Sequence, residues 1–206
     1  MLHLHDLRLW NMFAPSARDF YTIIEAGFSL PPEEYLKLLT NLTGALDGNK
    51  ATAAKDIPVL VSGSIVEQMW IFDLLEAAGG QVVAETYSAA WSIRLDTSNP
   101  LEALAMESLQ SYPMVSCVSM TRRKEMVLKA CRDYHIDGVI LHSNKSCLPI
   151  TLGQMDIKRA LQQELGVPSV VIEADHMDPA NFSLSQFEDR AGSFMEMLLE
   201  RKGGRT

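Results

Sequence analysis

The sequence predicts an α/β fold in which a mostly parallel sheet is covered by helices on both faces. From residue 57 onward, short apolar segments alternate with longer segments whose apolar residues recur at helical spacing. The connections between them are short and contain glycine or proline. Because parallel strands need crossover connections, usually helical, this alternation favours a parallel sheet between two helical layers.

The first fifty residues are expected to form a helical segment, 1–50, in front of an α/β domain at 51–206. Residues 31–34, Pro-Pro-Glu-Glu, make a good helix start, because proline suits the first turn and acidic side chains favour the positive end of the helix dipole. Apolar side chains then follow at helical spacing, at Tyr35, Leu38, Leu39 and Leu42. The polar run 47–50 indicates a turn or linker.

The α/β part begins with a strand, a helix and a second strand, which we predict at 57–62, 65–78 and 81–86. The first strand is short and apolar, and Gly63 and Ser64 turn it into the helix. Gly79 and Gly80 end that helix, because glycine is unfavourable in a helix interior. No internal repeat or low-complexity tract is evident.

The second half continues the alternation. The sequence predicts strands at 137–141 and 167–173 and helices at 100–109, 122–134, 155–165 and 186–201. Pro100 begins the first of these helices, and Gly166 ends the third. The last helix carries its apolar residues on one face, at Phe187, Ala191, Phe194, Met195 and Leu198. Residues 114–118 are expected to be a short extended segment.

Composition restricts the class of protein. The 206 residues are 47% hydrophobic and 21% charged, which is typical of a soluble globular chain with one domain or two small ones. A net charge of -8 argues against nucleic-acid binding. No apolar run approaches the length of a membrane span, and the first residues lack the apolar core of a secretory signal. Three irregularly spaced cysteines predict no disulfide framework, so a cytoplasmic location is the default expectation.

The most informative segment is 137–147, where a predicted strand rich in β-branched residues ends in a polar loop that carries Cys147. Ligands of open parallel sheets bind at the carboxyl ends of the strands. A thiolate there suits a metal or a cluster, although an ordinary surface cysteine fits the local pattern equally well. His142, at the end of the strand, could act as a base or hydrogen-bond donor, or be an ordinary loop histidine.

Other candidates have simpler explanations. Residues 63–64 could present backbone amides to an anion, but further glycines are lacking and a tight turn explains them better. The run Asp-His-Met-Asp at 175–178 could bind a metal, but such residues more often stabilise turns. Cys131 shares an apolar helix face and is expected in the core, and Cys117 is expected in a buried extended segment.

Several segments match one family when taken in order. Those in the second half read DGVILHSNKSC at 137–147, GQMDIKRAL at 153–161 and LGVPSVVIEAD at 165–175. Shorter matches accompany them at 61–64, 79–83, 99–105 and 186–196. Together they resemble the C-terminal half of 2-hydroxyacyl-CoA dehydratase subunits, a family that also includes the ATP-dependent benzoyl-CoA reductase subunits.

The resemblance implies a flavodoxin-like α/β domain of a heterodimeric, oxygen-sensitive iron–sulfur enzyme. It implies a [4Fe-4S] cluster held by three cysteines from two domains of each subunit, and a separate ATP-hydrolysing activator that delivers one electron. The implied reaction is radical removal of water from a 2-hydroxyacyl-CoA, or reduction of a related acyl-CoA. On this resemblance Cys147 is a cluster ligand, and Ser64, Ser88 and His142 line the substrate site at the same edge.

The chain also departs from the family pattern. Family subunits are considerably longer, and their N-terminal domain, which brings a cysteine ligand and much of the substrate pocket, has no expected counterpart here. Ser88 stands where the family's middle cysteine is expected, and serine replaces a soft thiolate poorly. Three interpretations therefore stay open: part of a longer or split subunit, a cluster-less partner of a catalytic paralogous chain, or a CoA-thioester-binding module of the same fold.

Overall fold

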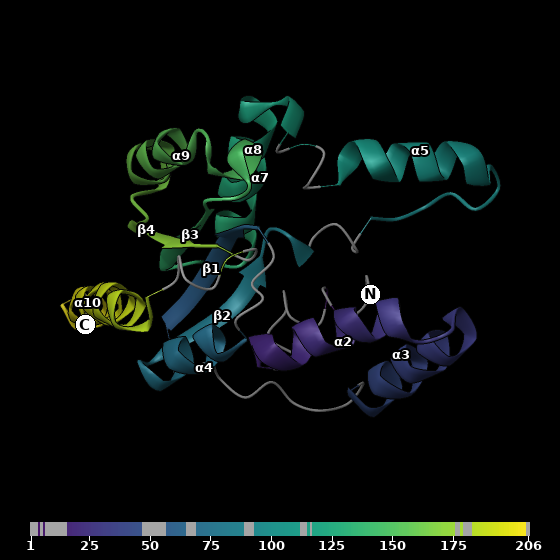
Figure 1. Ribbon diagram of the computed structural model, residues 1–206, viewed down its shortest axis with the longest axis horizontal. Coiled ribbons are helices and arrows are strands. Elements are labelled where there is room, and N and C mark those ends of the chain that lie inside the picture. Colours follow the sequence, from purple (N-terminus) through teal and green to yellow (C-terminus); the bar gives the residue numbers. More distant parts are fainter. Residues whose placement is uncertain are drawn as a thin grey trace.

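A four-stranded, all-parallel sheet forms the centre of the computed structural model (Figure 1). The structure describes residues 4, 6, 16–46, 57–64, 69–88, 93–111, 115, 117–175, 178 and 183–204. The strands are β1 (Ile57–Gly63), β2 (Gly80–Glu85), β3 (Gly138–Asn144) and β4 (Ser169–Ala174), in the order β2-β1-β3-β4. This arrangement confirms the predicted α/β class and is consistent with a flavodoxin-like fold.

The helices lie on both sides of the sheet or extend beyond it. They are α2 (Ala17–Ser29), α3 (Pro32–Leu46), α4 (Trp70–Ala77), α5 (Pro100–Gln110), α7 (Met120–Asp133), α8 (Leu148–Thr151), α9 (Gln154–Ala160) and α10 (Leu184–Gly203). A π-helical turn, η2 (Leu161–Leu165), continues α9, so the helix predicted at 155–165 comprises two elements. The helix predicted at 65–78 contains α4, and residues 65–68 lie outside the described residues.

The two faces of the sheet carry separate apolar layers. In Figure 1, α7 and α9 cover one face, and α4 and α10 cover the other. Val59 and Ile140 pack with α4 and α10, whereas Leu60 and Leu141 pack with α7 and α9. Successive strand residues point to opposite faces, which explains this division. Burial of each such aliphatic side chain stabilises the fold by about 1.5–3 kcal/mol.

The predicted N-terminal helical segment contains α2 and α3. Ser16 caps α2, because its side-chain oxygen accepts a hydrogen bond from the Asp19 amide at 3.0 Å. Tyr21 of α2 joins the layer of α4 and α10, while Phe20 and Ile24 form a smaller cluster with apolar residues of α3. Residues 47–56 lie outside the described residues, so the domain boundary at residue 50 stays a prediction.

The extended segment predicted at 114–118 is wrong. Val115, Cys117 and Val118 have helical backbone. The Val115 amide donates to the Ser111 oxygen at 3.0 Å, and the Ser119 amide donates to the Val115 oxygen at 3.1 Å. The described residues of this segment belong to none of the four strands of the sheet, so the β-propensity of valine does not decide their conformation. Cys117 is exposed, in contrast to the predicted burial.

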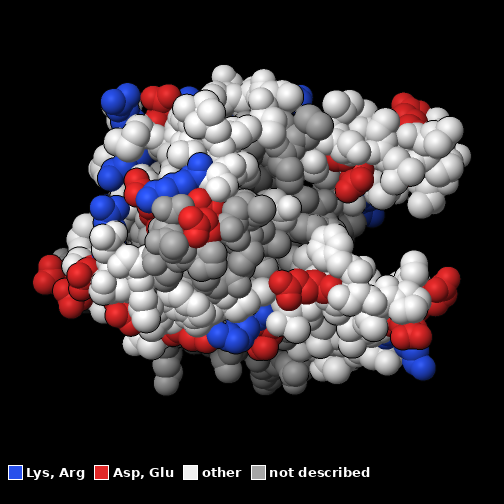
Figure 2. All heavy atoms as spheres, viewed as in Figure 1, with Lys and Arg blue, Asp and Glu red and all other residues white. Residues whose placement is uncertain are grey.

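Helix α5 projects from the main body of the molecule (Figure 1), and few charged side chains are visible on it in Figure 2. Its single buried residue is Ala103, whereas Leu101, Leu104 and Leu109 are 81%, 55% and 57% exposed. The apolar core therefore fixes α5 only weakly. In the described part of the chain, no helix has the length and apolar character needed to cross a membrane.

Candidate functional site

Buried polar side chains gather at the carboxyl edge of the sheet. Among the described residues, every buried polar or charged residue except Arg123 lies in the last three residues of a strand, in the turn that follows it, or at the start of α9. They are Ser62, Ser64, Glu85, Thr86, Ser88, His142, Ser143, Asn144, Gln154 and Asp175. Buried polar groups cost free energy unless they are hydrogen bonded, so such a concentration indicates a functional region.

The centre of this edge is the junction of β1 and β3. The chain runs from β1 to β2 on one side and reaches β3 on the other, so the strand order changes direction between β1 and β3. Gly63 lies opposite His142 there, with φ at +153°, and a Cβ atom on Gly63 would be 2.3 Å from the His142 oxygen. Only glycine permits this approach. Open α/β sheets bind ligands at such a switch point.

Hydroxyl groups connect the ends of β1 and β2. The Gly63 amide donates to Thr86 Oγ1 at 3.2 Å, and Thr86 Oγ1 donates to Ser62 Oγ at 3.3 Å. The Ser88 hydroxyl lies 3.0 Å from Glu85 Oε2 and 2.9 Å from the Glu85 backbone oxygen, and it donates to that residue. Ser88 therefore orients a carboxylate that is only 4% exposed.

Asn144 organises the loop that carries Cys147. The Cys147 amide donates to the Asn144 oxygen at 3.1 Å, and the Thr151 hydroxyl donates to the same oxygen at 2.6 Å. The Ser146 amide donates to Asn144 Oδ1 at 2.9 Å. Asn144 is fully buried, and Cys147 is partly exposed. The thiol therefore lies on a short loop whose backbone is fixed by the end of β3.

A further bond joins this loop to the end of β4. The Ser146 hydroxyl donates to Asp175 Oδ1 at 2.7 Å, and Asp175 is 3% exposed. Asp178, the other predicted acid of the run at 175–178, is exposed, and His176 lies outside the described residues. Asp175 thus connects two strand ends, and metal binding by the run at 175–178 stays a prediction.

The four predicted site residues come from three strand ends. Ser64 follows β1, Ser88 follows β2, His142 lies in β3 and Cys147 lies in the loop after β3. Ser64, Ser88 and His142 are 7%, 1% and 4% exposed. The Gln154 side-chain amide donates to the His142 backbone oxygen at 2.9 Å, which attaches α9 to the same edge. The structure brings the four residues to one edge, and their roles stay predictions.

The other thiols differ from Cys147. Cys131 is buried in the core beside α9, as predicted, and burial raises its pKa to about 12. Cys117 is exposed. Within the described residues, no three His, Cys, Asp or Glu side chains gather closely enough to hold a metal ion. A single thiolate does not retain an iron–sulfur cluster, so the described residues alone do not supply its ligand set.

Arg123 is a residue at this edge that the sequence analysis missed. It is fully buried in the first turn of α7, and its guanidinium nitrogens donate to the backbone oxygens of Pro149, Ile150 and Leu152. Arg123 precedes Val127 and Cys131 at intervals of four residues, so it lies on the apolar stripe of its helix. A charged residue on that stripe was the available signal, because arginine is rarely fully buried.

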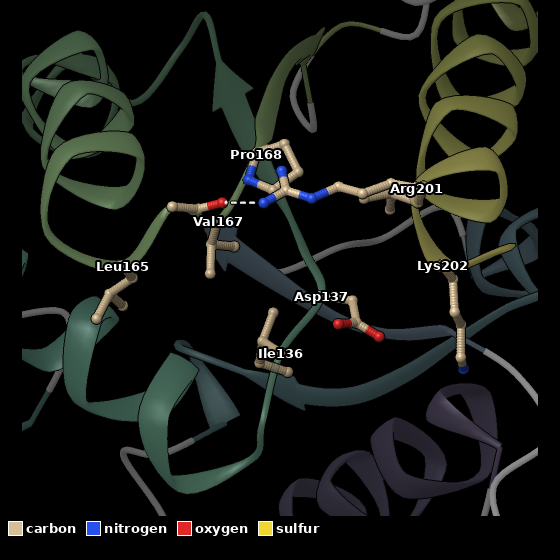
Figure 3. Close-up of a pocket in the computed structure, with 9 residues that line it drawn as sticks. Ile136, Asp137, Leu165, Val167, Pro168, Arg201 and Lys202 are labelled. Carbon is tan, nitrogen blue, oxygen red and sulfur yellow. Dashed lines mark hydrogen bonds between the residues drawn. The ribbon is translucent and has the colours of Figure 1, made fainter. Parts of the chain in front are cut away.

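The amino end of the sheet has a different character (Figure 3). A cavity of about 170 Å³ lies there, beside the residues that precede β3 and β4. It is lined by Ile136, Asp137, Leu165, Gly166, Val167, Pro168, Leu198, Arg201 and Lys202. Arg201 donates to the Gly166 oxygen at 2.8 Å. This cavity is at the opposite end of the strands from the predicted site and contains none of its residues.

Comparison with known proteins agrees with the sequence resemblance. The family model described as 2-hydroxyglutaryl-CoA dehydratase, D-component, matches residues 1–198. A benzoyl-CoA reductase subunit from Thauera aromatica is 30% identical over 131 residues, which are 61% of this chain and 30% of that protein. The alpha subunit of (R)-2-hydroxyisocaproyl-CoA dehydratase from Clostridioides difficile is 29% identical over 126 residues, 60% of this chain and 29% of that protein. The alpha subunit of (R)-2-hydroxyglutaryl-CoA dehydratase from Acidaminococcus fermentans is 27% identical over 136 residues, 65% of this chain and 27% of that protein. The matched part spans less than a third of each of these relatives.

Proposed function

The chain belongs to the 2-hydroxyglutaryl-CoA dehydratase D-component family, and on that premise we propose that it is the C-terminal α/β part of a subunit of a 2-hydroxyacyl-CoA dehydratase-type enzyme. The proposed enzyme removes water from a 2-hydroxyacyl-CoA by radical chemistry, or reduces a related acyl-CoA. The observation that carries this proposal is the buried polar edge at the β1–β3 junction, since the family-like segment 137–147 ends there in a thiol.

We assign Cys147 as one thiolate ligand of a [4Fe-4S] cluster. The described residues do not fit a whole cluster, so the remaining ligands have to come from further protein, in our proposal the other domain of a longer or split subunit. A paralogous dehydratase subunit is the proposed heterodimer partner. The relatives are themselves named as subunits, two of them as alpha subunits, which supports an assembly of several chains. When bound, the cluster would supply one-electron chemistry, with electrons from an ATP-dependent activator protein.

We assign the substrate side of the edge to Ser64, Ser88 and His142. Ser64 and His142 flank the β1–β3 junction, where a thioester group would meet polar side chains. Ser88 acts on Glu85, because its hydroxyl donates to that buried carboxylate. These side chains would orient the acyl-CoA and keep water from it.

The test is cluster content of the assembled protein. The chain is co-expressed with any co-encoded part of its subunit and with the longer homologous subunit, purified without oxygen, and iron and acid-labile sulfide are measured in the complex. Cys147→Ala is expected to lower both by about half, because a cluster with a missing thiolate is labile whereas the cluster of the partner subunit keeps its ligands. Cys117→Ala, which changes an exposed thiol, is the matched control and should leave both unchanged. Full iron, sulfide and turnover in the Cys147 variant would show that the assignment is wrong.

A second function has its own support. Ser88 occupies the position of the expected middle cysteine, and no group of three ligating side chains occurs among the described residues. These observations favour a cluster-less, non-catalytic partner subunit or a CoA-thioester-binding module of the same fold. A colourless, iron-free chain that still pairs with an iron-containing partner would support the first. Calorimetric binding of acetyl-CoA by the isolated chain would support the second.

A further inference from the structure

We propose that Arg123 is a positioning residue that fixes the Cys147 loop from the adjacent helix α7. The functional meaning of this inference rests on the proposed role of Cys147, but the contacts that carry it do not. Arg123 lies 24 positions before Cys147 in the sequence and is on a different secondary-structure element. The connection between them is therefore tertiary.

The first observation is where the guanidinium is bonded. Arg123 Nη1 donates to the Pro149 oxygen at 2.7 Å and to the Ile150 oxygen at 3.1 Å, and Nη2 donates to the Leu152 oxygen. These oxygens belong to the end of α8 and the residue after it. Terminal carbonyls of a helix lack partners within the helix and carry its negative dipole end. A planar guanidinium suits several such acceptors at once.

The second observation is that α8 depends on outside support. It has only four residues, which is too short to be stable by itself. Cys147 is its N-cap, and the Cys147 oxygen accepts from the Ile150 and Thr151 amides at 3.2 and 3.1 Å. Arg123 thus holds one end of a single turn, and Cys147 forms the other end. Fixing the carbonyl end of this turn fixes the backbone that carries the thiol.

The third observation is the close packing after α8. Gly153 has φ at +75°, and a Cβ atom there would lie 2.3 Å from Met120 Cε and 3.2 Å from Arg123 Nη2. The chain therefore turns directly over the first turn of α7. That turn is itself secured, since Ser119 caps α7 and Val127 and Cys131 are buried in the core. Helix α7 is a rigid base from which Arg123 reaches the loop.

The variant Arg123→Met tests the positioning of the Cys147 loop while disturbing the fold as little as possible. The methionine side chain is about as long as the aliphatic part of arginine and adds no buried charge, and apolar replacements of buried ions are often tolerated. Arg123→Met removes all three bonds to the α8 oxygens. Arg123→Lys keeps the charge but concentrates its donors on one nitrogen, so it should restore the contacts only in part.

The experiment measures alkylation of each cysteine by N-ethylmaleimide in the isolated full chain, with mass spectrometry to separate the three thiols. In Arg123→Met, the rate at Cys147 should rise about tenfold or more as the loop opens more often. The rate at Cys131, which is buried on the same helix, should not change. The exposed Cys117 reports reagent activity. Arg123→Lys should give an intermediate rate at Cys147.

Arg159→Met is the matched control, because Arg159 is 70% exposed and pairs with Asp156 on the surface of α9. It should alter none of the rates. Equal acceleration at Cys147 and Cys131 in Arg123→Met would show that Arg123 only stabilises the fold. An unchanged rate at Cys147 in both Arg123 variants would overturn the proposal. Neither result depends on iron, so failure of the cluster assignment is recognised separately, from the iron content of the co-purified complex.

Discussion

At the carboxyl end of the sheet, Thr86, His142 and Asn144 are buried, whereas at the amino end Arg201 and Lys202 border an open cavity and remain exposed. Both ends belong to the same four strands and are spanned by the same helix α7. Among the described residues, the amino end has the buried hydroxyl oxygen of Ser169 but no polar or charged residue that is buried as a whole. The concentration of buried polar residues at the carboxyl end costs free energy unless they are hydrogen bonded, which agrees with the site proposed there.

The largest expected difference between the two ends of the sheet is in the free energy of unfolding that is lost when a glycine is replaced by alanine. Gly63 and Gly166 both have positive φ, but a Cβ atom on Gly63 meets the His142 oxygen at 2.3 Å, whereas one on Gly166 has its nearest neighbour, Arg201 Nη2, at 4.0 Å. Gly63→Ala should lower the free energy of unfolding by about 3 kcal/mol or more, and Gly166→Ala by about 1 kcal/mol. Urea unfolding measures both. Equal losses would mean that the β1–β3 junction is no tighter than the amino-end turn.

A second expected effect is a decline in the free energy of unfolding at alkaline pH, caused by Cys131. Cys131, in the last turn of α7, has its pKa raised from 9.0 to about 12 by burial, so the folded chain keeps a proton that the unfolded chain loses. The stabilising contribution is complete below about pH 9 and is lost as pH rises towards about 12. By pH 10.5 the loss from this group should be about 2 kcal/mol.

The Cys131 prediction is measured by urea unfolding between pH 8 and 10.5. Cys131→Ala should flatten the decline in stability across this range, although the small cavity lowers stability at every pH. Cys117→Ala, at an exposed thiol, should retain the wild-type decline. If the Cys131 variant retains it as well, the thiol does not cause the alkaline loss.

A smaller effect is expected where Ser146 meets Asp175. Removing the hydroxyl in Ser146→Ala deprives a carboxylate that is 3% exposed of a donor at 2.7 Å, which should cost about 1–2 kcal/mol. Ser98 donates to Asp96 at the same distance, but both residues are exposed. Ser98→Ala should not change the urea midpoint measurably. Similar shifts for the two variants would argue that burial at the polar edge does not strengthen the bond.

The smallest effect is expected at the amino end. Arg201→Ala removes the bond to the Gly166 oxygen, but the side chain is exposed and water can replace it. The loss in unfolding free energy should stay below about 1 kcal/mol. The rate of Cys147 alkylation should be unchanged in this variant. An accelerated rate would show that the two ends of the sheet are coupled.

The local pattern of apolar residues predicted the strands of the sheet but not which strands lie next to one another. The apolar runs of β1 and β3, with Gly63 at the end of the first and a polar loop after the second, were sufficient to place strands and turns, because strands buried on both faces read as continuous apolar segments. The same reasoning gave a wrong extended segment at 114–118, because the β-propensity of Val115 and Val118 has an effect only within a sheet. Which strands pair with one another, and in which order they lie in the sheet, became known only from the structure.

The location of the predicted site residues at the carboxyl edge of the sheet followed from the same kind of pattern, whereas their roles stay predictions. The abrupt change from apolar to polar residues located the edge of Cys147 and His142. The partners of that loop could not be read in this way, because Arg123 and Asp175 reach it from other elements. An arginine in an amphipathic helix is ordinarily assigned to the solvent face. Only the positions of three carbonyl oxygens showed that Arg123 points the other way.

The all-parallel sheet has a consequence for how the chain acquires its structure. Val59 pairs with Gly138, so the central pairing cannot form until a long intervening segment has been synthesised and its ends have met. Until then β1 has one unpaired edge, which is open to pairing with another chain. Closure of such long loops slows folding and prolongs exposure to aggregation. We expect the yield of folded protein to depend on how soon β3 pairs with β1, and therefore on chaperones and temperature during expression.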